Sequence, residues 1–363
     1  MVSANAGAGE AIFRRENCGR CHTLYGDPRE GSPFMEWEPP PAGSLASRVG
    51  PDLGHEGHRR SDDWHSAHLL APALVVPGST MPASPHLFRP GPDGRPAPTR
   101  DAVDLVAFLQ VLGLSSGDVW AARRSREPEI PPPPPADGAL RARGNALYEA
   151  RCAPCHGTSG DGRGQAADLL LFPPRDFVAA HYRFRSTLPG LPPKDEDLFR
   201  SVSLGTGTGS AMPGFSFLPA TDRWALVLRV KEFSPALRGT GLRLSPGPPR
   251  GPEAGIEPGL IEEGRVLWRS LGCPACHGDR GTGLTREEAN AAWADPAGVP
   301  IPRSGDLTHD CALRAGASGE AVERSIRFGV GLAMPAYGEA LPGPRALAAL
   351  RSFVLWLRTS QGS

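Results

Sequence analysis

Apolar residues fall at helical spacing in stretches that come in three pairs along the chain. The first stretch of each pair is short and ends in an aromatic residue. In the second, apolar residues recur at i, i+3 and i+4. The chain between them is rich in Gly and Pro, which is typical of loops. The pattern predicts an all-α chain with three helix pairs. The first stretches hold Ile12 and Phe13, Leu147 and Tyr148, and Val266, Leu267 and Trp268; the second are residues 101–112, 222–233 and 345–358.

A Cys-x-x-Cys-His motif follows the first helix of each pair. This pentapeptide is the attachment signature of c-type haem, in which two thiols bind the porphyrin and the histidine binds the iron. Three copies use six of the seven cysteines. We therefore expect three covalently bound c-type haems. The residues are Cys18, Cys21 and His22; Cys152, Cys155 and His156; and Cys273, Cys276 and His277.

A methionine followed by proline lies downstream of each motif, at Met81, Met212 and Met334. Each is about 57 residues after its histidine, so the spacing is itself an internal repeat. A thioether ligand raises the potential of a haem relative to a second histidine. We expect these three methionines to be the second axial ligands, whereas Met35 fits a core position.

The repeat predicts three domains with Pro-rich boundaries. Five consecutive prolines at residues 131–135 favour a stiff polyproline II spacer. A second Pro/Gly-rich connector spans residues 245–258. The expected division is domain 1 at residues 1–115, a linker at 116–136, domain 2 at 137–236, a linker at 237–257, and domain 3 at 258–363.

Charge and composition limit the classes of function and the cell compartments that the sequence allows. The 39 basic and 39 acidic residues balance, so nothing indicates nucleic-acid binding or strong electrostatic steering. With 45 Gly and 41 Pro, we expect the chain to fold poorly without haem. Haem attachment to such motifs implies the periplasm or the periplasmic face of a membrane. No signal peptide and no apolar run of membrane-spanning length is visible, so we expect a signal or anchor to have been removed.

The order of elements in each repeat, namely helix, haem motif, Met-Pro and second helix, resembles the class I cytochrome c fold over almost the whole chain. That resemblance implies an all-α fold of three tandem class I cytochrome c domains, in which Gly/Pro-rich loops wrap covalent haems. The first repeat, with Gly50-Pro51-Asp52-Leu53, residues 60–65 (RSDDWH) and residues 75–82 (VVPGSTMP), is similar to the mono-haem subunit of the C-family haem–copper oxidases. The second repeat is similar to cytochrome domains found beside respiratory and dehydrogenase complexes.

The same resemblance implies further residues around the haems. In this family a proline carbonyl accepts a hydrogen bond from Nδ1 of the ligand histidine and so fixes the ring. Pro51 and Pro174 stand at the similar segments. The third segment, Ser304-Gly305-Asp306-Leu307, lacks that proline, and Pro302 could serve instead. Arg183 and Arg185 are candidates for hydrogen bonds to haem propionates, or else surface residues.

Other residues leave alternatives open. A histidine of the first repeat could replace Met81, or His55 and His58 could hold a separate metal ion. His309 and Cys311 offer too few donors for zinc, which takes four, so Cys311 is expected to be a buried thiol or part of a dimer disulfide. The histidines of the first repeat are His55, His58, His65, His68 and His86.

These expectations lead to a periplasmic electron carrier, not an enzyme, which relays single electrons through three His/Met-ligated haems to a redox partner. Its partners would be a protein donor and a protein acceptor. The first alternative is an electron-transfer subunit of a membrane respiratory complex of the terminal-oxidase type. The second is a haem enzyme or gas sensor with one open iron site.

Overall fold

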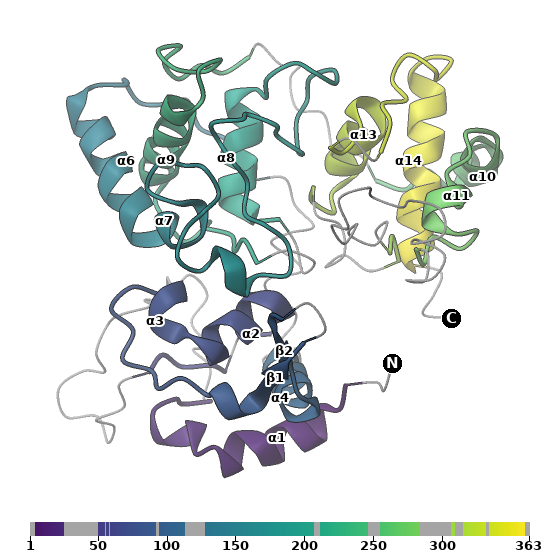
Figure 1. Cartoon of the computed structure of the whole chain (residues 1–363). Helices are drawn as coiled ribbons and strands as arrows, with labels where there is room; N and C mark the ends of the chain where they lie inside the picture. Colours follow the sequence, from purple (N-terminus) through teal and green to yellow (C-terminus); the bar gives the residue numbers. More distant parts are fainter. Residues whose placement is uncertain are drawn as a thin grey trace.

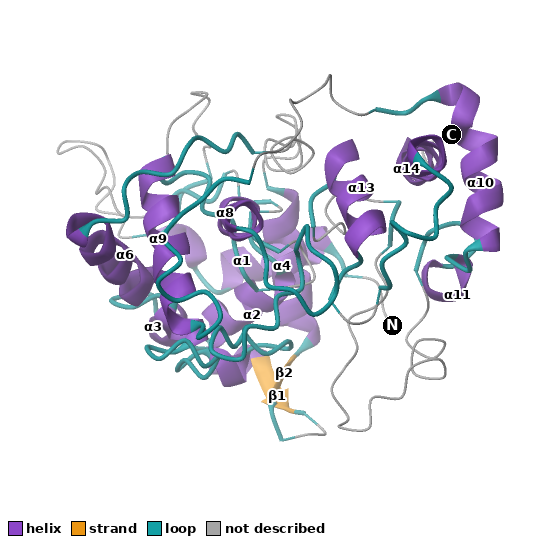
Figure 2. Cartoon of the chain, turned by 90° about the horizontal axis from the view of Figure 1, so that it is seen from above, coloured by secondary structure: helices purple, strands orange, loops and turns teal. Residues whose placement is uncertain are grey.

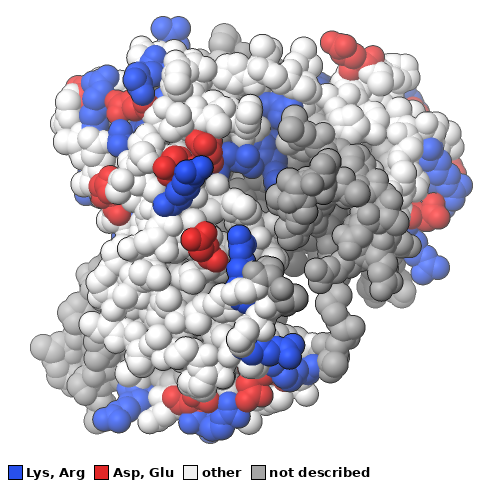
Figure 3. Space-filling model, viewed as in Figure 1, with Lys and Arg blue, Asp and Glu red and all other residues white. Residues whose placement is uncertain are grey.

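The computed structural model describes residues 4–24, 50–54, 56–57, 59–91, 94–112, 128–206, 211–245, 255–283, 306–308, 315–331 and 334–359. Three groups of helices are visible (Figure 1). We call them unit 1 (residues 4–112), unit 2 (residues 128–245) and unit 3 (residues 255–359). No helix in the described ranges has the length and apolar character needed to cross a bilayer. Acidic and basic side chains are interspersed over the described part of one face (Figure 3).

The elements of the described residues are mainly α-helical. Unit 1 contains α1 (Ala6–Arg15), α2 (Asp62–Leu70), α3 (Pro72–Val75), α4 (Arg100–Val111) and an antiparallel hairpin of β1 (Phe88–Pro90) and β2 (Pro96–Pro98). Unit 2 contains α6 (Gly138–Arg151), α7 (Ala153–His156), α8 (Asp195–Leu204) and α9 (Ala220–Phe233). Unit 3 contains α10 (Ile261–Ser270), α11 (Pro274–His277), α13 (Gly319–Phe328) and α14 (Pro344–Thr359). Single 3₁₀ turns lie at Cys18–Arg20, Pro85–Leu87, Ala167–Leu169 and Pro258–Leu260.

The first and last helices of each unit cross at a glycine. A Cβ on Gly9 of α1 would lie 1.9 Å from the carbonyl oxygen of Asp104 in α4. Gly144 and Gly264 are placed in the same way against the last helices of units 2 and 3, where a Cβ would lie 2.4 and 2.1 Å from a backbone oxygen. Only glycine lets two helix backbones approach this closely, so the predicted helix pairs α1–α4, α6–α9 and α10–α14 form one repeated contact.

An aromatic residue four positions after each of these glycines packs onto the last helix. Phe13 lies 5.5 Å from Phe108, Tyr148 lies 4.9 Å from Phe233, and Trp268 lies 5.7 Å from Phe353, measured between ring centroids. Each pair belongs to a separate buried cluster of its own unit. Tilted aromatic pairs contribute beyond the area they bury, so each unit has a core that surrounds its helix crossing.

A middle helix in each unit occupies sequence that we expected to be loop. The helices α2 and α13 each start with a serine cap, whereas in α8 the Asp197 side chain of the first turn accepts the amide of Lys194 at 3.0 Å. Ser61 accepts the amide of Trp64 at 3.1 Å, and Ser318 accepts the amide of Ala321 at 3.1 Å. Caps of this kind satisfy helix amides that have no intrahelical partner. The expectation of unbroken Gly/Pro-rich loops between the helix pairs was therefore wrong.

The proline run at the start of unit 2 packs onto that unit. Trp224 of α9 donates its indole N–H to the carbonyl oxygen of Pro131 at 3.0 Å, and Ile130 packs against the core of unit 2. The described part of the expected linker is thus attached to one unit and does not form a free-standing spacer. Residues 113–127 lie outside the described ranges.

Candidate functional site

Each Cys-x-x-Cys-His motif forms a single helical turn just after the first helix of its unit. The amide of His22 donates to the carbonyl of Cys18 at 3.0 Å, and that of His156 donates to Cys152 at 2.8 Å. The amide of His277 donates to Cys273 at 3.0 Å. Residues three and four apart on a helical turn lie on the same side. The turn therefore presents two thiols and an imidazole on one side, as covalent haem attachment requires.

The six motif cysteines are all half-buried. Burial raises the pKa of Cys152 to about 12 and the pKa of Cys155 and Cys273 to about 11. These thiols are therefore protonated at neutral pH. Within the described residues, no three His, Cys, Asp or Glu side chains converge on a point that could hold a metal ion.

The ring of the motif histidine is held by a backbone carbonyl. Nδ1 of His22 lies 2.9 Å from the carbonyl oxygen of Pro51, and Nδ1 of His156 lies 2.9 Å from that of Arg175. With Nδ1–H as donor, Nε2 keeps its lone pair for a metal ion. Burial lowers the pKa of His156 to about 4, so this ring is neutral at physiological pH, as a ligand must be.

The acceptor in unit 2 is Arg175, one residue after the expected Pro174. A repeated backbone contact sets the register. The amide of Leu53 donates to Thr23, that of Phe177 to Gly160 at 2.7 Å, and that of Leu307 to Gly281 at 2.6 Å. Pro174 then matches Gly50, and Arg175 matches Pro51. The bond uses a backbone oxygen, so its position does not depend on a proline side chain. Pro302, Ser304 and Gly305 lie outside the described residues.

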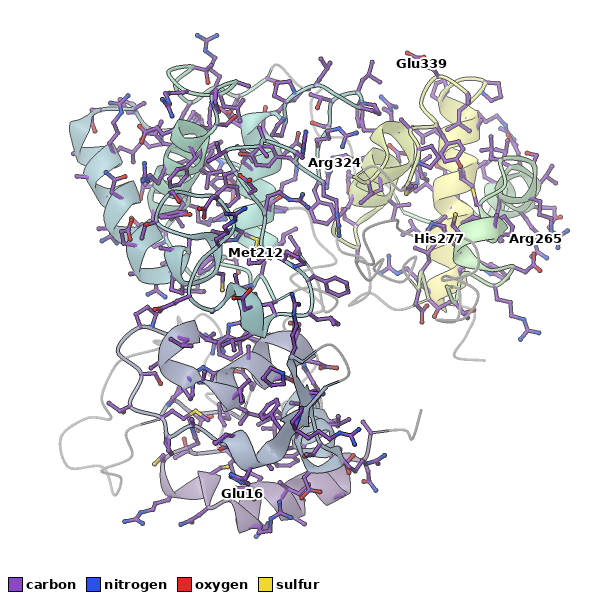
Figure 4. All side chains as sticks on the ribbon, in the orientation of Figure 1. Glu16, Met212, Arg265, His277, Arg324 and Glu339 are labelled. Atoms are coloured by element: carbon purple, nitrogen blue, oxygen red, sulfur yellow. The ribbon has the colours of Figure 1, made fainter. Side chains whose placement is uncertain are left out.

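The three candidate methionines lie in loops that follow the middle helices or α3. Met81 and Cys18 both pack against the core of unit 1, and Met334 and Cys273 both pack against the core of unit 3. The methionine loops of units 2 and 3 start at glycines of positive φ, Gly205 at 68° and Gly329 at 71°. A Cβ there would lie 2.7 Å from the Met212 carbonyl oxygen and 2.4 Å from that of Met334. Figure 4 marks Met212 at the end of unit 2 that faces unit 1 and His277 on α11.

Several buried donors at these sites have no hydrogen-bond partner among the described residues. Nε of Arg185 and the hydroxyl of Tyr182 are buried without a hydrogen bond in unit 2, and the indole N–H of Trp268 is buried in the same way in unit 3. Buried donors cost free energy unless an acceptor satisfies them. An anionic group such as a haem propionate would do so. Arg183 instead lies against unit 3, where the amide of Gly331 donates to its carbonyl oxygen at 2.9 Å.

The described histidines of unit 1 outside the motif are engaged elsewhere. His86 pairs with Glu16 at 2.8 Å on the surface. His65 is buried 3.7 Å from Glu56, and burial lowers its pKa to about 4. His68 stacks on Trp64 with 4.6 Å between ring centroids. Nε2 of His65 and Nδ1 of His68 are nonetheless buried without a hydrogen bond to a described residue, so a histidine in place of Met81 stays an alternative. His55, His58, His309 and Cys311 lie outside the described residues.

A buried charge cluster in unit 1 was not foreseen from the sequence. Burial alone would raise the pKa of Glu56, but the guanidinium groups of Arg60 and Arg59 lower it to about 2. Arg60 lies 2.8 Å from this carboxylate and also covers the ring of Trp64. The signal available in the sequence was the pair of adjacent arginines, Arg59 and Arg60, five and four residues before Trp64.

Comparison with known families agrees with this geometry. The family model "Cytochrome C oxidase, cbb3-type, subunit III" matches twice, at residues 139–228 and 259–354, which together make up just over half of the chain. The chain belongs to this cytochrome c family. The model "Cytochrome C oxidase, mono-heme subunit/FixO" matches residues 37–111, which confirms the expected resemblance of the first repeat. Membership implies covalently bound c-type haem and a role in electron transfer, and cytochromes c of this kind are typically extracytoplasmic.

A solved structure gives a second comparison. The cytochrome is similar to a chain of the reducing HAO-like protein complex of Kuenenia stuttgartiensis, with a TM-score of 0.50 and 29% sequence identity. The match covers 59% of this chain and 95% of that chain. No curated protein matches the cytochrome.

Proposed function

We propose that this cytochrome relays single electrons through three c-type haems held in three tandem domains on the periplasmic side of a membrane. The observation that carries the proposal is the repetition of one site. In each unit a glycine-centred helix crossing is followed by a helical turn that presents two thiols and a histidine. The three expected domains correspond to units 1, 2 and 3.

Each proposed site assigns a role to named residues. The two cysteines of each motif would anchor the porphyrin, and the motif histidine and the Met-Pro methionine would bind the iron. A haem bound in this way supplies one-electron chemistry with little rearrangement of its ligands. The protein contributes orientation, since the carbonyls of Pro51 and Arg175 fix the rings of His22 and His156. Arg185 and Trp268 offer buried donors to propionates.

A role inside a respiratory complex is the second candidate. Both matching family models describe subunits of cytochrome c oxidases. We therefore expect the donor and the acceptor to be redox proteins, one of which could be a membrane complex. Purification of the tagged chain from mild detergent extracts distinguishes the two cases. Recovery of a stoichiometric oxidase partner would indicate a subunit, and a single protein in the soluble fraction would indicate a free carrier.

Mass spectrometry of the intact denatured protein tests the haem count directly. The wild type should carry the mass of three haems, and replacement of both cysteines of one motif by alanine should remove one. Exposure of the dithionite-reduced protein to carbon monoxide then tests the ligands. No spectral change would fit three iron centres with both axial positions filled. Rapid binding at one centre would instead favour catalysis or gas sensing.

A further inference from the structure

Unit 1 and unit 2 share a small buried apolar cluster. From unit 1 it contains Ala67 of α2 and Val75 of α3, and from unit 2 it contains Ala166, Leu170 and Ala211. All five side chains are buried. Trp64 and Val76 of unit 1, and Cys155 and Leu169 of unit 2, pack around them. The turn that carries the second haem motif therefore lies against unit 1, with α7 next to α3 (Figure 1), and unit 1 overlaps unit 2 in the view from above (Figure 2).

Hydrogen bonds join the same two surfaces. The Asp63 carboxylate, at the start of α2, accepts the amides of Leu171 and Phe172, with 2.9 Å between its Oδ1 and the nitrogen of Leu171. Gln165 donates its side-chain N–H to the carbonyl oxygen of Leu74 at 3.2 Å. Hydrogen bonds therefore fix the position of the two surfaces against each other, in addition to their apolar packing.

The surroundings of Asp63 set it apart from an ordinary helix-capping carboxylate. Its second oxygen, Oδ2, is buried without a partner. Burial raises the pKa of Asp63 to about 6, and the charge of Asp62 on the same helix acts in the same direction. Asp63 is held against unit 2 by the amide of Leu171, and Cys155, the residue before His156, packs against the same apolar contact. A buried carboxylate therefore lies on the surface that faces the second haem motif.

We infer that the α2 face of unit 1 is the docking surface for the second haem motif, and that Asp63 is the positioning residue that holds the motif there and sets its electrostatic environment. The inference rests on the proposed function, because it assigns Asp63 a role toward the second proposed haem. A nearby carboxylate favours the more positive oxidised state of an iron centre. Asp63 should therefore lower the potential of the second site.

Hydrogen exchange in the haem-loaded full-length protein tests the positioning role. In Asp63→Asn, the amides of residues 165–172 should exchange roughly tenfold faster or more, because an NH2 group replaces the buried Oδ2 at a position where it finds no hydrogen-bond partner. Asp62→Asn is the matched control. It removes the same charge one residue away, but Asp62 is exposed and accepts from Gln110 within unit 1. Unchanged exchange in Asp63→Asn, or an equal change in both variants, would overturn the inference.

A redox titration at about pH 8, where Asp63 is ionised, tests the electrostatic role. The component assigned to the second site by its response to Met212→Ala should move to higher potential in Asp63→Asn and stay in place in Asp62→Asn. Equal shifts in both variants would show a general charge effect and refute the assignment. If Asp63→Asn folds poorly, Leu171→Pro removes the donated N–H instead. The preceding Leu170, at φ −94° and ψ 140°, already has the conformation that a following proline favours.

The proposed function and the docking surface can be refuted separately. A wild-type protein without three covalent haems would defeat the proposed function, whatever the exchange data show. Normal haem content with no response of residues 165–172 to Asp63→Asn and Leu171→Pro would defeat only the docking surface.

Discussion

The glycine at each helix crossing permits a sharp test within a single helix. Helix α1 contains both Gly7, which is exposed, and Gly9, which is buried against α4. A Cβ on Gly7 would meet only the side-chain oxygen of its neighbour Asn5, at 3.4 Å. A Cβ on Gly9 would lie 1.9 Å from the carbonyl oxygen of Asp104 and 2.7 Å from Cβ of Phe108. The same substitution by alanine should therefore have opposite effects at the two positions.

The expected magnitude follows from two opposing contributions. Glycine to alanine gains up to about 1 kcal/mol of helix propensity at an accessible site, which is the whole effect expected for Gly7→Ala. For Gly9→Ala the backbone of α4 must move away, and overpacking of this kind costs about 1 to 3 kcal/mol and sometimes more. A gap of 0.5–1 Å along the crossing forfeits roughly a quarter to a half of the dispersion energy of the contacts it opens. We expect a net loss of about 2 kcal/mol in the free energy of local opening.

Hydrogen exchange of α1 and α4 in the haem-loaded full-length protein measures this opening free energy. A loss of about 2 kcal/mol corresponds to roughly thirtyfold faster exchange in Gly9→Ala, against equal or slower exchange in Gly7→Ala. The equivalent substitutions Gly144→Ala and Gly264→Ala should behave like Gly9→Ala in their own units. If Gly9→Ala protects α1 as well as Gly7→Ala does, the two helices do not approach as closely as described.

Three further results are expected. Met334→Ala should lower the potential of one haem and allow carbon monoxide to bind to it, as seen by redox titration and absorption spectroscopy; an unchanged spectrum would reject Met334 as a ligand. Burial raises the pKa of Asp63 from 3.8 to about 6, so the folded chain holds this proton more tightly than the unfolded chain. The free energy of unfolding of the wild type relative to Asp63→Asn should therefore fall as the pH rises through that window, which urea titrations can measure. Lys231→Met leaves its buried partner Asp195, 2.6 Å away, without a cation. This change should lower the free energy of opening of α8 and α9 by about 3 kcal/mol, and the additional change Asp195→Leu should recover much of that loss.

The outer helices of each unit could be predicted because they carry strong local signals. The apolar periodicity of the last helices, α4, α9 and α14, spans three or more turns, and the haem motif marks where each first helix ends. The glycine four residues before Phe13, Tyr148 and Trp268 was also present in the sequence as a repeat. Its meaning, however, depends on the distance to a second helix about 80 to 95 residues away, which local patterns do not encode.

The middle helices and the hairpin were missed for different reasons. Helices α2, α8 and α13 lie in sequence whose Gly and Pro favour loops, and no haem motif marks where they end, although α8 and α13 are as long as the predicted helices α1 and α10. The caps at Ser61 and Ser318 were the available signal. The strands β1 and β2 contain prolines at their ends, which argued against pairing. Arg175 was missed because the contact uses its backbone oxygen, which no side-chain motif reveals.

The contrast between the helix crossings and the α2 face has a consequence for how such chains are assembled by gene fusion. Both helices of a crossing belong to the same unit and pack in that unit's core. Unit 3 could therefore be exchanged for another cytochrome c module that brings its own intact core. Units 1 and 2 have a different constraint, because Ala67 and Val75 on one side must match Ala166 and Leu170 on the other. Hybrids joined between units 1 and 2 should keep the core of each unit but lose the fit between their two apolar surfaces. Hybrids that take residues 4–245 from one parent should keep that fit.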